Sequence, residues 1–138
     1  MRRSLRILLV DQESETRKPL EHGLSAMGLL VTACPGEQQA LGLCFSGAFD
    51  AVVVDVALLV EGDMRLTRRL REHVPYKSLP ILGLKKPGAP EVGPGSGLDQ
   101  IIPYQDDPRD LYHAVHRLRQ QRGLLASAES SPQNRHRS

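Results

Sequence analysis

Two acidic residues stand where buried strands are expected to end, and they are the side chains of this sequence best placed for chemistry. Asp11 follows the apolar run ILLV, and Asp55 follows the apolar run AVVV. Near-continuous apolar runs of this length are typical of parallel strands that helices cover on both faces. Because ligands bind beyond the carboxyl ends of the strands in open α/β sheets, we interpret the two acids as parts of a site. The alternative for Asp11 is a helix cap after its strand.

The chemistry that two such carboxylates could carry is metal-dependent phosphoryl transfer. Two carboxylates that lie close together repel each other, and a bound cation keeps both of them ionised. Mg²⁺ prefers oxygen ligands and pairs with phosphate groups. A carboxylate beside such an ion can attack a phosphoryl group and become an aspartyl phosphate.

The elements that must position these acids alternate along the chain. Apolar runs predict strands at 29–34, 50–55, 79–84 and 100–102 after a first strand that ends at Val10, and helical periodicity predicts helices at 17–27, 37–46 and 63–73. Residues 56–62 are expected to be a loop, and the Asp107–Pro108 pair is expected to begin a last helix that stops at Gly123. We place the start of the first helix near Thr16 because Pro19 is tolerated only in a first turn.

Strands that alternate with helices predict an α/β fold with one parallel sheet. Five strands at this spacing suit the flavodoxin-like order 2-1-3-4-5, in which strands one and three are neighbours. Asp11 and Asp55 would then share one crevice. A helix is not expected between the fourth and fifth strands, because residues 87–97 contain three prolines and four glycines.

Composition limits the classes of function. The 138 residues fit one domain, expected at 1–123, with a polar, disordered tail at 124–138. A net charge of +2 and 4% aromatic residues argue against a nucleic-acid partner. No apolar run is long enough for a membrane helix, and Cys34 and Cys44 form no CxxC pair, so we expect a soluble cytoplasmic protein with reduced, buried thiols.

Four stretches together resemble the receiver domain of two-component response regulators, the CheY-like family: RILLVD (6–11), FDAVVVD (49–55), LPIL (79–82) and GLD (97–99). The resemblance covers roughly residues 4–122. It implies that Asp55 is the phosphoacceptor, that Asp11 acts on Mg²⁺, and that the backbone carbonyl of Ala57 is a further metal ligand.

The sequence also departs from the family at positions that contact metal or phosphate. Where the family has a second acid after the first strand, this chain has Gln12, and Glu13 could replace that acid only imperfectly. Lys85 stands where the family has the Thr or Ser that senses the phosphoryl group. Tyr104 and Gln105 align with the usual Lys-Pro pair after the fifth strand. These changes indicate a degenerate receiver with weak or absent Mg²⁺ binding.

Lys85 suggests a sharper hypothesis. If its ammonium group reaches Asp55, a cation of the chain itself would take the region of the metal and the phosphoryl group. The alternative is that Lys85 extends into solvent.

We therefore expect an atypical receiver domain that signals mainly by protein–protein contact, with phosphorylation of Asp55 impaired or absent. The partner would be a sensor kinase or a downstream effector, and a homodimer is a further option; no membrane partner is expected. The alternatives are a Mg²⁺-dependent phosphoacceptor, enzymatic only in its own phosphorylation on Asp55, and the regulatory domain of a transcription regulator without its output domain.

Two other features have ordinary explanations. His113 and His116 could hold a metal, but such a pair is more often a partly exposed helix face, and no third ligand is evident. The arginines of helix 63–73 could contact an acidic partner or nucleic acid, although a solvated face is the default interpretation.

Overall fold

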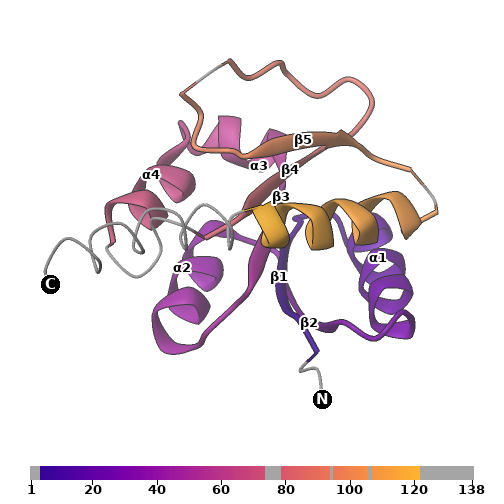
Figure 1. Ribbon diagram of the computed structural model, residues 1–138. Helices are drawn as coiled ribbons and strands as arrows, with labels where there is room; N and C mark the ends of the chain where they lie inside the picture. The colour runs from indigo at the N-terminus through magenta and orange to yellow at the C-terminus, as the bar shows by residue number, and fades with distance from the viewer. Residues whose placement is uncertain (1–3, 74–78, 94, 106, 122–138) are drawn as a thin grey trace, which may run out of the picture.

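The fold is built on one parallel five-stranded sheet (Figure 1). The structure is a computed structural model that describes residues 4–73, 79–93, 95–105 and 107–121. The strand order is β2-β1-β3-β4-β5, as predicted. The strands are β1 (Arg6–Val10), β2 (Leu30–Cys34), β3 (Ala51–Asp55), β4 (Ile81–Lys85) and β5 (Gln100–Pro103). The tail predicted at 124–138 lies outside the described residues.

The helices are α1 (Ser14–Ala26), α2 (Glu37–Ser46), α3 (Val56–Glu61) and α4 (Arg65–Glu72), and a further helix occupies residues 109–121. This last helix is drawn in orange to yellow in Figure 1 and crosses the sheet on the same side as α1. The bounds of α2 agree with the prediction, and the strand bounds agree to within two residues.

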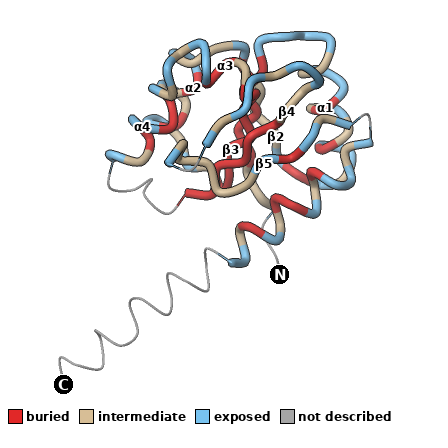
Figure 2. The backbone as a smooth tube through the Cα atoms, turned by 90° about the horizontal axis from the view of Figure 1, so that it is seen from above, coloured by how far each residue is buried: buried red, intermediate tan, exposed pale blue. Residues whose placement is uncertain are grey.

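Side chains of alternate strand residues pack into two separate hydrophobic cores, one on each face of the sheet. Ile7 and Leu9 of β1 pack with α1 and the last helix, whereas Leu8 and Val10 pack with α2, α3 and α4. All four side chains are fully buried, and Figure 2 shows the central strands as a continuous buried band. This double coverage is the reason that β1 and β3 are apolar at nearly every position.

The first helix begins earlier than predicted. Its first residue is Ser14, so Pro19 lies inside the helix rather than in its first turn. The prediction gave Pro19 too much weight, because the first turn is secured by other bonds. The backbone N–H groups of Thr16 and Arg17 both donate to the carbonyl of Glu13.

The loop predicted at 56–62 is instead the short helix α3. The carboxylate of Asp55 caps it by accepting a hydrogen bond from the N–H of Ala57. Asp63 and Met64 then take positive φ angles of 54° and 57°, which separate α3 from α4. The prediction of one helix over 63–73 therefore holds only from Arg65.

No helix occurs in the described part of the connection between β4 and β5, as the prolines and glycines predicted. We call residues 86–97 the strap. The hydroxyl of Thr67 donates to the carbonyl of Ser96 at 2.8 Å, and Arg71 donates to the carbonyl of Gly97. Gly97 has a φ of +88°, and a Cβ there would come within 2.9 Å of the Thr67 Cβ. The strap is thus fastened to α4 where only glycine fits.

The predictions for the cysteines agree with the structure, since Cys34 and Cys44 are both free and buried. Among the described helices, none has the length and apolar character needed to cross a membrane.

Candidate functional site

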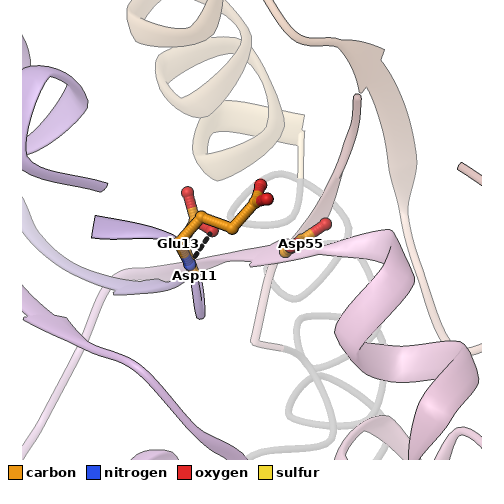
Figure 3. Close-up of side chains that lie close together, drawn as sticks. All are labelled: Asp11, Glu13 and Asp55. Atoms are coloured by element: carbon orange, nitrogen blue, oxygen red, sulfur yellow. Dashed lines mark hydrogen bonds between the residues drawn. The ribbon is translucent and has the colours of Figure 1, made fainter. Parts of the chain in front are cut away.

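The two predicted acids converge at the carboxyl edge of the sheet (Figure 3). Strands β1 and β3 are neighbours, and Val10 pairs with Val54, so the residues that follow them also lie side by side. Asp11 is 0% exposed and Asp55 is 1% exposed. Full burial of two carboxylates demands compensating hydrogen bonds and charge.

Asp11 is held in place by the start of α1. One of its carboxylate oxygens accepts a hydrogen bond from the N–H of Glu13 at 3.0 Å, and the other accepts from the hydroxyl of Thr16. Arg17 donates to the Asp11 backbone carbonyl at 2.8 Å. The N-cap residue of α1 is Glu13 and not Asp11, so the helix-cap alternative for Asp11 is wrong. The Asp11 carboxylate instead holds the turn before the helix and belongs to the acidic cluster.

The charge that compensates both acids comes from Lys86. Its ammonium Nζ lies 2.7 Å from Asp11 Oδ1, 2.5 Å from Glu13 Oε1 and 3.4 Å from Asp55 Oδ2. The Lys86 side chain is only 12% exposed. One cation of the chain thus bridges three carboxylates.

The hypothesis that Lys85 reaches Asp55 is wrong by one residue. Lys85 Nζ instead pairs with Glu91 Oε2 of the strap at 2.6 Å, and the Glu91 side chain is 86% exposed. Lys85 is the last residue of β4, so the alternation of the strand fixes the direction of its side chain. Lys86 is the first residue beyond the strand, and this alternation does not constrain it. The sequence did contain a signal, namely a second lysine after the strand.

Burial and the neighbouring charges shift the pKa values of Asp55 and Lys86 in opposite directions. Burial raises the pKa of Asp55, partly offset by the charge of Lys86 and the hydrogen bond from Ala57. Burial alone lowers the pKa of Lys86, but hydrogen bonds to Asp11 and Glu13 and the charges of Asp11 and Asp55 outweigh it. The net pKa of Lys86 is raised, so the ammonium form is retained at neutral pH.

The remaining predicted site residues lie around this edge with different surroundings. Gln12 is exposed, while Glu13 replaces it in the acidic cluster. Ala57 lies in the first turn of α3, where carbonyl oxygens accept helix bonds, so its metal-ligand role stays a prediction. Tyr104 follows β5 and packs against the core on the α1 side.

The oxygen donors at the site fit Mg²⁺ in chemistry. Asp11, Glu13 and Asp55 each offer one carboxylate oxygen, and these atoms lie within 4.8 Å of one another. Within the described ranges this is the single group of three or more acidic, histidine or cysteine side chains that could share an ion, and it does not include His113 or His116. Lys86 already contacts all three carboxylates, however, so a metal ion would have to displace its ammonium group.

Comparison with known proteins gives a consistent result for the fold. No protein-family model matches the sequence. A candidate response regulator of Chloroflexus aurantiacus is similar at a TM-score of 0.75 and 25% identity, over 85% of this chain and 98% of that one. The chemotaxis response regulator CheY4 of Vibrio cholerae gives a TM-score of 0.72 and 23% identity, over 84% and 99%.

The response regulator TrrA of Thermotoga maritima, in complex with Mg²⁺–BeF, gives a TM-score of 0.70 and 24% identity, over 83% of this chain and 98% of that one. These likenesses agree with the observed strand order. The chain therefore has the receiver-domain fold of the two-component response regulators.

Proposed function

We propose that this protein is an atypical receiver domain of two-component signalling that acts by binding a signalling protein, with phosphorylation of Asp55 impaired or absent. The observation that supports this is the contact of the Lys86 ammonium group with Asp11, Glu13 and Asp55. The site holds its own cation in the region where the metal of an active receiver would bind.

The physical argument is competition for the same oxygens. Mg²⁺ needs the Asp11 and Asp55 carboxylates, and both are already paired with Lys86. Displacing Lys86 would break its hydrogen bonds and leave a largely buried ammonium group to find new partners. The free energy of metal binding therefore has to offset the loss of the Lys86 contacts before a phosphoryl group can be transferred.

The second candidate function is an active phosphoacceptor. It is favoured by the position of Asp55 beside two further carboxylates. When bound, Mg²⁺ would neutralise charge on a phosphoryl group, and Asp55 would be the nucleophile. Lys86 would then have to turn from the carboxylates toward the phosphoryl oxygens. The metal complex of TrrA is a property of that protein and does not decide between the two candidates.

Incubation with acetyl phosphate and Mg²⁺, followed by intact-mass measurement, tests the proposal. The expected result is little or no added phosphoryl group on the wild-type chain. Full conversion to a form with a single added group, which disappears in Asp55→Asn, would contradict the proposal and establish the second candidate.

A further inference from the structure

Strand β2 forms one edge of the sheet and presents unpaired backbone groups on its outer side. Leu30 donates to the Leu5 carbonyl on the β1 side, and the Cys34 carbonyl accepts from Asp11 on the same side. Because alternate residues of a parallel strand bond to the same neighbour, Thr32 also faces β1. Val31 and Ala33 therefore direct their N–H and C=O groups outward, and no described residue bonds to these four groups.

The β2 edge lacks the protection that edge strands usually carry. Proteins discourage strand pairing with charged residues or proline on the exposed edge. Pro35 follows β2 directly, but the strand itself, Leu30–Cys34, contains neither a charged residue nor a proline. The stretch from Leu29 to Gly36 contains no charged residue, and Leu30 is 55% exposed.

We propose that β2 pairs with the β2 strand of a second copy of this chain in antiparallel orientation, centred on Thr32. This register places Val31 opposite Ala33 of the other copy, and Ala33 opposite Val31. All four outward-facing backbone groups of each copy then find partners, because outward-facing residues meet outward-facing residues. The inference does not depend on whether Asp55 is phosphorylated.

The side chains fit this register as well as the backbone does. Val31 faces the smaller Ala33 on the α1 side of the sheet, and the exposed Leu30 faces the smaller Cys34 on the α2 side. At the centre, Thr32 lies opposite Thr32 of the second copy, and a Thr–Thr pair is favourable across antiparallel strands. Since the strand is uncharged, no like charges are brought together along it.

The flanking helix adds area to the contact. A helix that joins two neighbouring parallel strands lies over that pair, so α1 covers β1 and β2 on its face of the sheet (Figure 1). Pairing at the β2 edge would then bring α1 and its copy to about 10 Å, which is a normal helix-packing distance. The second copy thus continues both the sheet and one helical layer.

Charge substitutions at the centre of the pair provide the test. Sedimentation over a concentration series should show a reversible dimer for the wild-type chain. Thr32→Lys and Thr32→Asp each place like charges opposite each other, so each should weaken the dimer by about fivefold or more. An equimolar mixture of the two variants should restore association, because opposite charges then meet. Ile101→Lys, on the exposed opposite edge, is the matched control and should leave the dimer unchanged.

Hydrogen exchange gives a second readout that does not depend on a variant. The Val31 and Ala33 amides should exchange rapidly at low protein concentration and become protected at high concentration. The proposal is overturned if the wild-type chain stays monomeric throughout, or if Ile101→Lys abolishes a dimer that the Thr32 variants leave intact. Neither result would bear on Asp55 phosphorylation, which the intact-mass measurement decides separately.

Discussion

Lys85 and Lys86 are adjacent in the chain, yet their ammonium groups serve different parts of the molecule. Lys85 Nζ lies 2.6 Å from Glu91 of the strap, at the surface. Lys86 Nζ lies 2.7 Å from the fully buried Asp11. The pair provides a natural control, because two lysines that differ by one position have entirely different partners.

Removing Lys86 should destabilise the fold, while removing Lys85 should not. Lys86→Met leaves Asp11 and Asp55 buried without their cation, and breaking a buried charge pair costs about 3 kcal/mol. Lys85→Met removes a pair with an exposed glutamate and should cost less than about 1 kcal/mol. Urea unfolding at neutral pH measures both free energies. Equal losses for the two variants would contradict the assigned role of Lys86.

Asp55→Asn should stabilise the protein at neutral pH. Burial raises the pKa of Asp55 above its value in the unfolded chain, so its contribution to stability is present below the unfolded pKa and is lost as pH rises through the folded pKa. The amide has no charge to bury and should gain about 1 kcal/mol at neutral pH. Urea unfolding should show the gain shrinking as pH falls into the acid range. A variant less stable than the wild type at neutral pH would be evidence against this assignment.

Arg71 should be the residue of α4 on which the strap most depends. Its guanidinium group donates to the carbonyl oxygens of Leu79 and Gly97 at 2.6 and 2.8 Å, and to Asp99 at 2.8 Å. Arg71→Met should therefore lower the free energy of unfolding by about 2–3 kcal/mol.

The matched control for Arg71→Met is Arg69→Met on the exposed face of the same helix. This variant should stay within about 0.5 kcal/mol of the wild type. Thermal or urea unfolding distinguishes the two. Similar stabilities for both variants would show that the strap does not depend on the guanidinium contacts.

Gly83 of β4 should not tolerate a side chain. A Cβ there would lie 2.8 Å from Leu98 Cδ1 and 3.0 Å from Val56 Cγ2, in the packing that seats the start of α3 beside Asp55. Gly83→Ala should lower the free energy of unfolding by about 1–3 kcal/mol through overpacking. Gly42→Ala, where a Cβ would meet no atom within 4 Å, should be neutral or stabilising by comparison. Chemical denaturation of the two variants in parallel measures the difference.

The sheet and the two acids could be predicted because their signals are local. Apolar runs identify buried strands, and a parallel sheet brings the carboxyl ends of β1 and β3 to one edge whatever the details of packing. The absence of a helix before β5 also follows from the proline and glycine content of the strap.

The errors concern features that are decided by specific hydrogen bonds and by pairing within the sheet, rather than by apolar periodicity or residue propensity. The start of α1 depends on bonds from Thr16 to Asp11 and Glu13, which outweigh the local effect of Pro19. The assignment of the buried cation depended on where β4 ends. A change of one residue there exchanges a surface lysine for a site lysine. Sequence spacing alone does not fix that boundary, because strand ends are set by their neighbours in the sheet.

Competition between Mg²⁺ and the Lys86 ammonium group is tested most directly by a calorimetric Mg²⁺ titration of three proteins. These are the wild-type chain, Lys86→Met and Lys85→Met. Competition between the metal and the Lys86 ammonium group predicts that Lys86→Met binds Mg²⁺ at least about tenfold more tightly than the wild type, a difference of about 1.4 kcal/mol. Lys85→Met should bind like the wild type. If the wild-type chain binds Mg²⁺ as tightly as Lys86→Met, the ammonium group does not stand in the place of the metal, and the account of an internally neutralised receiver site is wrong.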